Sequence, residues 1–598
     1  MSTLETPVLI VGGGGFGLSM SIFLANNGVD SLLVERHPHP APRPKARYLN
    51  QRAMEIFRQH GLAEEIYRRS IPLEYISRSR WCTSLGGDGP YDRKVLFEIE
   101  TFGGGSLAPH YKANSPCEST IFPQVRLEPL MRAHAQALPL GQLRFNCSLV
   151  GFEQDGDGVT ARVEDRATGE VHTVRAKYLI AADAGKTVGP LVGVRMEGTP
   201  ELIDMVTVYF KADLSKYLDD DHSFAYWFAN PHGDTGSWGT GVLGKLGPTR
   251  FDRHSEEWQF HFSFKSDDPQ RFDEDKLVPR MRALLKIPEL EPEVLSIGHW
   301  IVQGVLADRF RVGRVILGGD AAHRHTPTTG LGLNSAIQDA QNLAWKLGMV
   351  LKGQASDALL DTYETERRPA TERNVKWALF TFSNHMLTGS AIGIVPGDPA
   401  RSRANFEALL ADDEDGESRR HRFREVMKLH NTEYQANDLE IGVIYATGAL
   451  VPDGTPVPRR DPTGRNYVPT TRPGARLPHA WIEHGSNRIS TQDLVPRDGF
   501  VLITGCPGSP WEAAAHTVFG RAGVKLEVAC IADAAVLTDT KNNWRRIREI
   551  GDDGALLVRP DQVIAWRMRE GVTDAEAELD AALRVITRRS RQHASATS

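Results

Sequence analysis

The sequence predicts an α/β fold in which a nucleotide-binding unit is interleaved with a largely antiparallel sheet. A short apolar run at 8–11 is followed by glycines and then by apolar residues at helical spacing, which indicates a strand, a loop and a helix. A second strand-like run over 30–35 closes a βαβ unit before the proline-rich stretch 38–44 breaks regular structure. Aromatic residues cluster among the β-rich segments of 202–300, which predict the second sheet.

Later segments predict a small sheet, long helices and a final unit. Residues 143–183 alternate β-like runs with turn signals, so a small sheet is expected there. After Asn334 the apolar positions step by three and four up to Gly353, which predicts an amphipathic helix with a glycine stop. An acidic patch lies at 412–417, and the Pro/Gly/Arg-rich segment 451–478 is typical of a linker. We expect four parts: a nucleotide-binding domain over 1–200 and 300–395, a substrate-binding sheet domain over 201–299, a helical and linker region over 396–464, and a C-terminal domain over 465–598.

Composition excludes several classes of protein. The 598 residues include 70 Lys and Arg against 76 Asp and Glu, a formal charge of −6, so the basic surface of a nucleic-acid binder is missing. No apolar run approaches the roughly 18 residues of a membrane-spanning helix, and the amino terminus lacks the features of a signal peptide. The five cysteines show neither CxxC nor metal-ligand spacing, which suits a reducing compartment. We expect a cytoplasmic protein that binds a small molecule, with no nucleic-acid partner, no metal and no membrane span.

The first glycine-rich loop has the spacing of a dinucleotide-binding turn. Gly12 permits the tight turn, Gly14 lets backbone N–H groups approach a phosphate, and Gly17 allows the helix to pack close to the strand. Glu35 ends the next strand 21 residues after Gly14, where a carboxylate binds ribose hydroxyls. Because a glutamate repels the 2′-phosphate of NADP, this site is expected to hold FAD or NAD.

A second loop, some three hundred residues later, favours FAD over NAD. Asp320 follows the strand 314–317 and is placed to accept hydrogen bonds from ribityl hydroxyls. Residues Gly330 to Asn334 present backbone N–H groups at a helix start, whose positive end would stabilise a reduced flavin by about 1 to 2 kcal/mol. Two such loops in this order predict one FAD held at both ends.

These motifs resemble those of the single-component FAD aromatic hydroxylases, the p-hydroxybenzoate hydroxylase superfamily. Besides the two loops, the segment 178–185 is similar to the family's DG motif, with Ala184 in place of its glycine. Lys45 stands where the family commonly has an arginine beside the isoalloxazine, and Gln124 matches the glutamine that contacts the flavin. The variant at 324–334 is closest to phenol and chlorophenol monooxygenases and to relatives that act on polyketides.

The resemblance implies a fold and a set of cofactor-binding residues. It implies a Rossmann-type FAD-binding domain interleaved with a β-sheet substrate domain, plus a C-terminal thioredoxin-like domain carried by 499–505 and 555–567. Cys506 is followed by Ser509 where a dithiol needs its second cysteine, so packing or homo-oligomer contact is the expected role of that domain. The residues expected to bind the cofactor are Gly12, Gly14, Gly17, Glu35, Arg36, Lys45, Ala46, Gln124, Asp183, Asp320, Pro327, Gly330, Leu331, Gly332, Leu333 and Asn334.

The resemblance also implies a reaction. In the family, NADPH or NADH reduces FAD, O2 is captured as a flavin C4a-hydroperoxide, and one oxygen passes to an electron-rich ring. The glycines of 241–247 have the wrong spacing for a second dinucleotide loop, so NAD(P)H is expected to visit transiently. We expect an aromatic substrate that is a phenol, a hydroxypyridine or a polyketide.

Three residues are candidates for the catalytic site. Arg47 occupies a position where relatives often place a polar residue, and it either steadies a phenolate or binds a phosphate of NAD(P)H or FAD. In the β-rich segment 226–228 the side chains alternate, so either Trp227 or the pair Tyr226 and Phe228 points toward the flavin. His323 and His325 are expected to support the flavin turn by hydrogen bonding.

Three other functions compete with hydroxylation. A flavin halogenase would share the fold, but it usually shows WxWxIP and no WxW occurs among the eleven tryptophans. A flavoprotein that only binds an aromatic compound is a second alternative, because fold alone does not determine function. A flavin dehydrogenase without oxygen transfer is the third, and incorporation of label from 18O2 distinguishes it from a monooxygenase.

Overall fold

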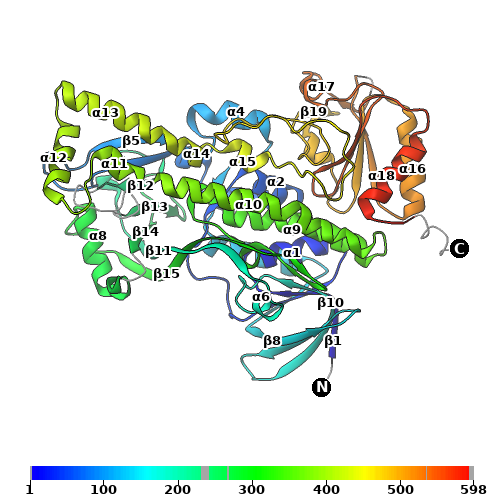
Figure 1. The fold of residues 1–598 in the computed structure, drawn as a ribbon, viewed down its shortest axis with the longest axis horizontal. Coiled ribbons are helices and arrows are strands. Elements are labelled where there is room, and N and C mark those ends of the chain that lie inside the picture. Colours follow the sequence, from blue (N-terminus) through cyan, green and yellow to red (C-terminus); the bar gives the residue numbers. More distant parts are fainter. Residues whose placement is uncertain (1–2, 230–240, 265–267, 534, 591–598) are drawn as a thin grey trace.

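The computed structural model describes residues 3–229, 241–264, 268–533 and 535–590. The C-terminal unit lies at one end of the long axis, and helices α11 (Leu387–Ile392), α12 (Pro399–Leu410) and α13 (Glu414–Met427) lie at the other (Figure 1). The long helices α9 (Leu331–Leu351) and α10 (Asp361–Asn384) cross the middle of the molecule between them. Within the described residues, none of the helices is both long and apolar enough to span a bilayer.

The first sheet is the predicted nucleotide-binding unit. Its main path runs β16-β17-β10-β1-β2-β7, and β1 (Thr3–Val11) pairs in parallel with both β2 (Ser31–Glu35) and β10 (Val171–Ala181). The strand β17 (Val315–Leu317) also pairs in parallel with β10, which brings the second loop to the same sheet edge as the first. The other strands of this sheet are β7 (Gln142–Phe145), β8 (Cys147–Gln154), β9 (Val159–Asp165) and β16 (Arg311–Val312).

The small sheet expected over 143–183 is an extension of this first sheet. β1 pairs with β10 along nearly its whole length, whereas β9 pairs antiparallel with the first half of β10 and β17 pairs in parallel with its end; β9 also pairs with β8. At 11 residues, β10 is long enough to take β9 and β17 one after the other. Figure 1 shows this hairpin projecting from the lower side of the molecule beside the N-terminus.

The second sheet has eight strands in the order β18-β15-β11-β14-β13-β12-β4-β5. Strands β4 (Arg78–Cys82) and β5 (Val95–Glu100) belong to it although they come from the amino-terminal part of the chain. β4 pairs in parallel with β12 (Ser223–Phe228), and the remaining neighbours are antiparallel. Its other strands are β11 (Met196–Lys211), β13 (Val242–Gly247), β14 (Glu257–Phe264), β15 (Glu293–Ala307) and β18 (His323–Arg324).

Helices surround the two sheets. The predicted helix after Asn334 is α9, which begins at Leu331 and packs against α1 (Gly15–Asn26). The acidic patch at 412–417 forms the start of α13, where Asp413 caps the N–H of Gly416 at 2.8 Å and further carboxylates lie near the positive helix end. The other helices of this part are α2 (Gln51–Gln59), α3 (Ala63–Arg69), α4 (Ala108–Asn114), α5 (Gln124–Ala137), α6 (Val188–Leu191), α8 (Leu277–Leu285), α14 (Asn431–Tyr434) and α15 (Asn437–Ile441).

The C-terminal unit has a four-stranded sheet in the order β22-β21-β24-β25. β21 (Phe500–Thr504) is parallel to β22 (Leu526–Cys530) and antiparallel to β24 (Ala555–Val558), which pairs antiparallel with β25 (Ile564–Met568). Helices α16 (Pro510–Ala522) and α18 (Ala575–Thr587) pack against each other, and their apolar faces share a core with strands of the sheet. A small second sheet and a short helix complete the unit: β19 (Trp481–His484), β20 (Asn487–Ser490), β23 (Leu537–Thr538) and α17 (Asn543–Ile547).

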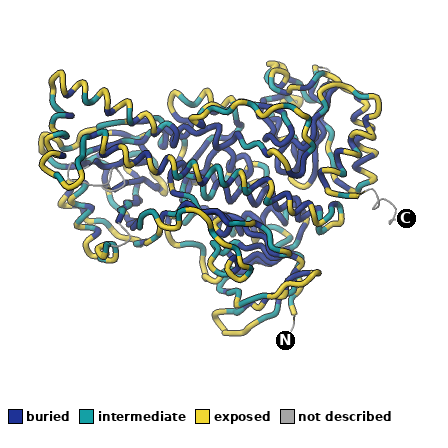
Figure 2. The backbone as a smooth tube through the Cα atoms, viewed as in Figure 1, coloured by how far each residue is buried: buried dark blue, intermediate teal, exposed yellow. Residues whose placement is uncertain are grey.

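Separate hydrophobic cores lie under these layers, and Figure 2 shows the buried chain concentrated along the sheets and central helices. The two faces of the second sheet contribute to different cores, one of which contains Trp81 and Trp227 and the other Tyr226 and Phe260. Trp345 of α9 belongs to the core of the C-terminal unit. The C-terminal unit therefore shares buried apolar surface with the nucleotide-binding part.

Candidate active site

The first loop is shaped to bring backbone against a phosphate. Gly12 has a φ of 116°, and a Cβ there would lie 2.2 Å from the carbonyl oxygen of Ala182. A Cβ at Gly17 would lie 1.9 Å from the carbonyl oxygen of Gly12, so only glycine allows this approach of helix and strand. By contrast, a Cβ at Gly14 would have its nearest neighbour at 3.6 Å. Protein atoms therefore fill the space beside Gly12 and Gly17 and leave space beside Gly14.

The two predicted loops touch each other. A Cβ at Gly15 would lie 2.5 Å from Cδ1 of Leu333, and a Cβ at Gly318 would meet the ring of Phe16 at 2.1 Å. These contacts join residues that are some three hundred positions apart in the sequence. The predicted arrangement, one ligand between two loops, is sterically consistent with this contact.

The carboxylate of Glu35 lies at the end of β2, beside the first loop. It accepts hydrogen bonds from the backbone N–H groups of Gly13 at 2.7 Å and His37 at 2.9 Å. Arg36, the next residue, is exposed, and its Nε lies 3.2 Å from Nε2 of His37. Glu35 is therefore fixed where a ribose would meet the strand end.

The second loop makes a left-handed turn before α9. Thr329 and Gly330 have φ values of 61° and 66°, and a Cβ at Gly330 would lie 2.7 Å from the ring of Tyr48. Asn334 then ties the turn to the chain around Tyr48. Its side-chain amide donates to the carbonyl oxygens of Tyr48 at 3.0 Å and Gly330 at 2.6 Å, and its Oδ1 accepts the N–H of Asn50 at 3.0 Å.

Other members of the second loop differ in exposure. Pro327 and Gly332 flank the turn, and the side chain of Leu331 is buried in a small core with Ala378 and Leu439. Asp320 is exposed in a short 3-10 turn over Gly319–Ala321, at the sheet edge and within reach of solvent or a ligand.

The segment 45–47 runs along the start of α5. The N–H of Gln124 donates to the carbonyl oxygen of Ala46 at 2.8 Å, and the N–H of Ala46 donates to Oε1 of Gln124 at 3.3 Å. The N–H of Phe122 donates to the carbonyl oxygen of Arg47 at 2.7 Å. Lys45, Ala46 and Gln124, which the sequence placed in one site, therefore lie next to one another.

Asp183 acts on its own loop. Its carboxylate accepts the N–H groups of Gly185 at 3.1 Å, Thr187 at 2.6 Å and Val188 at 2.9 Å. Ala184, which replaces a family glycine, has a φ of 56° and so adopts the left-handed conformation despite its side chain. Asp183 shapes this turn; the structure shows its carboxylate on backbone N–H groups.

Sequence reasoning did not single out Glu128, which faces the first loop. It is buried, it is the nearest neighbour of a Cβ built on Gly14, and it accepts the N–H of Ala41 at 3.0 Å and an amide hydrogen of Gln124. Burial raises the pKa of Glu128, while Gln124 and Ala41 oppose the rise. Glu128 lies four residues after Gln124 in a helix, so the two side chains share one face, and this spacing could have indicated Glu128 from the sequence.

Arg47 projects under the second sheet. Its guanidinium carbon lies 5.2 Å from the ring centre of Phe224, and a Cβ at Gly244 would meet Nη1 at 2.2 Å. That Nη1 is buried and has no hydrogen-bond partner within the described residues. Burial lowers the pKa of Arg47 to about 10, with Tyr434 opposing the shift, so the group remains a cation at neutral pH.

The alternation in β12 puts Trp227 and Tyr226 on opposite faces. Trp227 lies on the face that carries Phe224 and Arg47, and its indole N–H donates to Oγ of Ser79 at 3.2 Å. Tyr226 lies in the other core, and its hydroxyl is 3.4 Å from the carbonyl oxygen of Asp220. Trp227 shares its core with Tyr48, whose ring lies beside Gly330 of the second loop, and which of the two alternatives meets the flavin stays a prediction.

The two histidines of the second loop have different surroundings. Nε2 of His323 lies 2.6 Å from Oδ2 of Asp339, whose Oδ1 accepts a hydrogen bond from Arg367 at 2.7 Å, and all three side chains are buried. His325 is buried, neither ring nitrogen has a partner among the described residues, and burial lowers its pKa well below 6.5. His323 therefore supports the loop, whereas His325 has polar atoms available.

These features fit FAD. Open backbone at Gly14, a strand-end carboxylate and the N-terminus of α9 supply the contacts that a pyrophosphate, a ribose and a flavin require. Within the described residues, Nη1 of Arg47 and both ring nitrogens of His325 are buried without a hydrogen-bond partner. Arg47 lies against Gly244 of the second sheet, and His325 lies beside Gly332 of the second loop. The fold and site define a flavoprotein with an aromatic-lined sheet beside its cofactor.

Comparison with known proteins confirms this class and makes it specific. The FAD binding domain family model matches residues 5–378, and the family model for the aromatic-ring hydroxylase C-terminal domain matches residues 470–589. The chain belongs to the FAD-dependent aromatic-ring hydroxylases. It is a flavin monooxygenase that uses FAD.

Its relatives match over nearly their whole length. The chain is 35% identical over 591 residues to the 2,4-dichlorophenol 6-monooxygenase of Delftia acidovorans, covering 98% of both chains. It is 32% identical to the phenol 2-monooxygenase of a Pseudomonas species, covering 97% of this chain and 92% of that one. The flavin-dependent monooxygenase PieE, solved with FAD and substrate, superposes with a TM-score of 0.90 at 35% identity, covering 98% of this chain and 99% of that one.

Proposed function

We propose that this monooxygenase hydroxylates a ring that already carries a hydroxyl group, in a phenol, a hydroxypyridine or an aromatic polyketide, at the expense of NADPH or NADH. The supporting observation is Arg47, a cation whose buried Nη1 has no hydrogen-bond partner among the described residues and whose guanidinium lies over Phe224, on an aromatic-lined face of the second sheet. A phenolate is a stronger nucleophile than a phenol, and a nearby cation stabilises it. Relatives named for 2,4-dichlorophenol, phenol and tetracenomycin B2, and one named a putative polyketide hydroxylase, support this substrate class.

The residues of this chain supply the surroundings of the reaction. FAD, when bound, supplies the reduction by NAD(P)H and the transfer of one oxygen atom from O2. Phe224, Trp227 and Trp81 line the buried face next to Arg47 and exclude water from it. Arg47 would stabilise the negative charge of the substrate oxygen, and the turn over Thr329 and Gly330 would hold the cofactor.

The C-terminal unit has a structural role in this proposal. The strand order β22-β21-β24-β25, with α16 joining the two parallel strands, is the arrangement of a thioredoxin-like domain and supports that assignment. Ser509 caps α16 where a dithiol would need a cysteine. All five cysteines are free, which supports a reducing compartment such as the cytoplasm. The role that we propose for the unit is packing or homo-oligomer contact.

The test measures coupled turnover. Purified holoenzyme is mixed with phenol, 2,4-dichlorophenol, 3-hydroxypyridine or a hydroxylated anthraquinone, and NADPH and NADH consumption is followed together with product mass under 18O2. We expect at least one compound to stimulate consumption and to gain one labelled oxygen. Stimulated oxidation without label in the product contradicts hydroxylation and favours a dehydrogenase, and binding without stimulation favours a flavoprotein that only binds aromatics.

A further inference from the structure

Two polar side chains of strand β14 lie on the same face of the second sheet as Arg47, and the reaction as described so far does not use them. In β14, Trp258 and Phe260 belong to the core on one face of the sheet. Because side chains alternate along a strand, Gln259 and His261 stand on the opposite face. β14 is the fourth of the eight strands, so both residues lie near the middle of the sheet.

The strand register places Gln259 next to Arg47. Gly244 of β13 is the direct partner of Gln259. A Cβ on Gly244 would lie 2.2 Å from Nη1 of Arg47, so the guanidinium lies on the backbone of Gly244. Side chains of directly paired residues stand about 5 Å apart on one face of a sheet. The amide of Gln259 and the guanidinium of Arg47 are therefore neighbours.

Both neighbours carry a buried polar atom without a partner. Gln259 is 2% exposed, and its Oε1 has no hydrogen-bond partner within the described residues. The same is true of Nη1 of Arg47, so the two groups do not bond to each other either. An amide oxygen accepts hydrogen bonds, a guanidinium N–H donates them, and leaving either unpaired in the interior costs free energy. The pair thus offers one acceptor and one donor to a ligand.

His261 adds a third polar group two residues further along β14. Its Nδ1 lies 2.8 Å from Oγ1 of Thr207, which also accepts a hydrogen bond from the indole N–H of Trp300 at 3.0 Å. Burial, and then the charge of Arg47, lowers the pKa of His261 to about 3, so the imidazole is neutral at neutral pH. With the hydroxyl hydrogen of Thr207 donated to Nδ1, the ring proton lies on Nε2 and is available to a ligand.

Solvent reaches this face although it belongs to central strands. His261 of β14 and Trp300 of β15, which share the face, are both partly exposed. On the other face of β14, Trp258 and Phe260 are fully buried. Protein atoms therefore leave space over β14 and its neighbours, in which a planar ring can lie against Gln259 and His261.

The spacing of these groups restricts where a bound ring carries its substituents. Neighbouring strands lie about 4.8 Å apart. Two oxygens on adjacent ring carbons are closer together than this, whereas two oxygens in a 1,3 relation span such a distance. A ring whose first hydroxyl lies at Nη1 of Arg47 therefore presents a second hydroxyl to Gln259 from the 1,3 position.

We propose that Gln259 and His261 determine the specificity of the hydroxylation by binding a second hydroxyl of the substrate, in a 1,3 relation to the hydroxyl that Arg47 stabilises. The second hydroxyl donates its hydrogen to Oε1 of Gln259 and accepts the N–H of His261. The substrate class is thus a 1,3-dihydroxylated aromatic ring rather than a ring with a single hydroxyl. This inference rests on the proposed function, because it uses Arg47 as the site of the first hydroxyl.

The first experiment measures binding in the absence of reaction. Phenol, 1,2-dihydroxybenzene and 1,3-dihydroxybenzene, and then 2-naphthol, 2,3-dihydroxynaphthalene and 1,3-dihydroxynaphthalene, are titrated into oxidised holoenzyme without NAD(P)H. The change in the flavin absorption spectrum gives Kd. On the ring system that binds better, we expect the 1,3 compound to bind about tenfold more tightly than its two analogues. Equal affinity for the three substitution patterns overturns the proposal.

The second experiment removes the amide and keeps the length of the side chain. We expect Gln259→Met to weaken binding of the 1,3 compound by about tenfold and to leave that of the monohydroxylated analogue unchanged. The Tm of the ligand-free holoenzyme is expected not to fall, because the variant removes a buried unpaired group. Gln492→Met is the matched control, since Gln492 is also buried with Oε1 unpaired within the described residues, but in the C-terminal unit. It is expected to leave every Kd unchanged.

The other results each contradict the proposal. A lower Tm of Gln259→Met, with weaker binding of every compound, would assign Gln259 to packing. Weaker binding of FAD by this variant, measured by flavin fluorescence, would assign the amide to the cofactor. If no phenolic compound binds to the wild type or stimulates it, the proposed function fails as well. If phenol or 2-naphthol is turned over and binds as tightly as its 1,3 counterpart, only this inference fails.

Discussion

At the scale of single residues, Gly14 and Gly17 differ in what surrounds them. A side chain at Gly17 collides with backbone at 1.9 Å, whereas a side chain at Gly14 meets only the tip of Glu128 at 3.6 Å. Protein atoms therefore leave space beside Gly14 that a ligand can occupy. Substitutions at Gly14 and Gly17 are expected to affect cofactor binding and folding, respectively.

We expect Gly14→Ala to fold normally and to bind FAD at least about tenfold more weakly, because a methyl group would push the pyrophosphate away from the backbone N–H groups. Gly17→Ala is expected to destabilise the apoprotein by about 1 to 3 kcal/mol through overpacking. Flavin fluorescence titration and denaturant unfolding measure the two effects. Gly156→Ala is the control, since nothing lies within 4 Å of its Cβ; equal FAD affinity in Gly14→Ala and this control would contradict the assignment.

Glu440 is a second residue whose environment makes a measurable prediction. Burial raises its pKa from 4.5 to about 8, partly opposed by the hydroxyl of Tyr48, which donates to Oε1 at 2.7 Å. Because the folded-state pKa is above the unfolded one, the folded protein binds the extra proton between these values. The contribution to stability is complete below about pH 4.5 and is lost as pH rises toward 8, at up to about 1.4 kcal/mol per pH unit.

We therefore expect Glu440→Gln to become more stable relative to the wild type as pH increases from 5 to 8. Glutamine keeps an acceptor for Tyr48 and removes the ionisation. Urea unfolding at several pH values checks the difference, and the exposed Glu407→Gln is expected to show no such trend. A constant difference between Glu440→Gln and the wild type across this range would show that Glu440 does not retain its proton.

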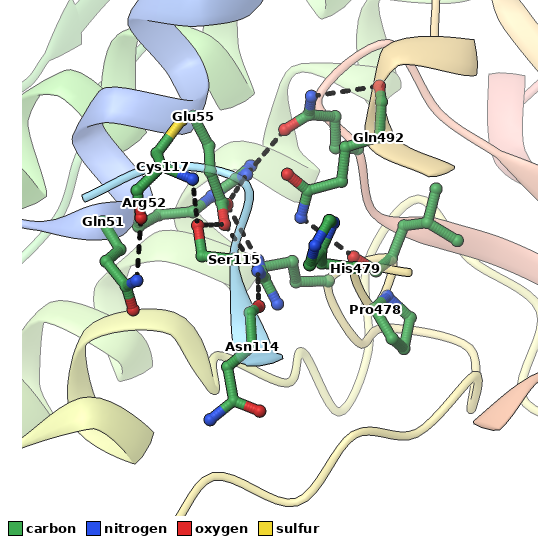
Figure 3. Close-up of polar contacts among 12 residues, drawn as sticks. Gln51, Arg52, Glu55, Asn114, Ser115, Cys117, Pro478, His479 and Gln492 are labelled. Carbon is green, nitrogen blue, oxygen red and sulfur yellow. Dashed lines mark hydrogen bonds and ion pairs between the residues drawn. The ribbon is translucent and has the colours of Figure 1, made fainter. Parts of the chain in front are cut away.

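At the scale of elements, helix α2 links the flavin segment to the chain that leads into the C-terminal unit. Figure 3 shows Glu55 of α2 surrounded by Arg52 and Ser115, and Arg476 donates to both carboxylate oxygens of Glu55 at 2.5 and 2.8 Å. Burial opposes ionisation of Glu55, yet the neighbouring arginines lower its pKa to about 2. The carboxylate is charged, and its ionisation depends on Arg476.

Arg476→Ala is expected to destabilise the protein by about 3 to 5 kcal/mol, because it leaves a buried carboxylate without its main partner. Arg58→Ala is the matched control: Arg58 also joins α2 to the C-terminal unit, through Asp493 at 2.8 Å, but its side chain is 42% exposed. An exposed pair of this kind contributes about 0 to 1 kcal/mol. Equal losses in the two variants, measured by chemical unfolding, would show that burial of the pair is unimportant.

The sequence predicted the elements whose signal is local. The βαβ unit that ends at Glu35 and the helix that follows Gly330 have glycine boundaries and regular apolar spacing, and both are present. The placement of β4 in the second sheet was not predictable, because its partner β12 is about 145 positions away and the pairing is parallel. For the same reason no pattern indicated that Gln259 lies beside Arg47, because the two meet only when β13 pairs with β14 and the segment 45–47 lies on Gly244.

At the scale of the whole molecule, a buried ionic network joins the C-terminal unit to the central helices. Arg559 donates to both carboxylate oxygens of Glu366 at 2.7 and 2.9 Å, and Lys346 donates to the same carboxylate at 2.8 Å. These residues come from the C-terminal unit, α10 and α9, and all are buried. Beside them Trp345 packs against Phe500, with ring centres 5.9 Å apart. Polar and apolar contacts thus both cross this interface.

The interface predicts that the C-terminal unit and the nucleotide-binding part unfold together. In the wild type, FAD at about 100 times its dissociation constant is expected to stabilise the whole molecule by about 2.7 kcal/mol and to raise the Tm of one calorimetric transition. Arg559→Met removes the hydrogen bonds that Arg559 donates to the buried carboxylates of Glu366 and Asp561 and leaves Glu366 with Lys346 and Asn342, so it is expected to cost about 3 to 5 kcal/mol across the interface. The C-terminal unit then melts first, in a transition that no longer responds to FAD.

Lys525→Met controls for loss of a charge in the same unit, because Lys525 pairs with Asp498 at 2.7 Å at the surface. It is expected to keep a single transition that responds to FAD. If Arg559→Met also keeps one FAD-dependent transition at an unchanged Tm, the network does not couple the two parts. If it shows two transitions that both respond to FAD, the apolar contact of Trp345 with Phe500 carries the coupling instead.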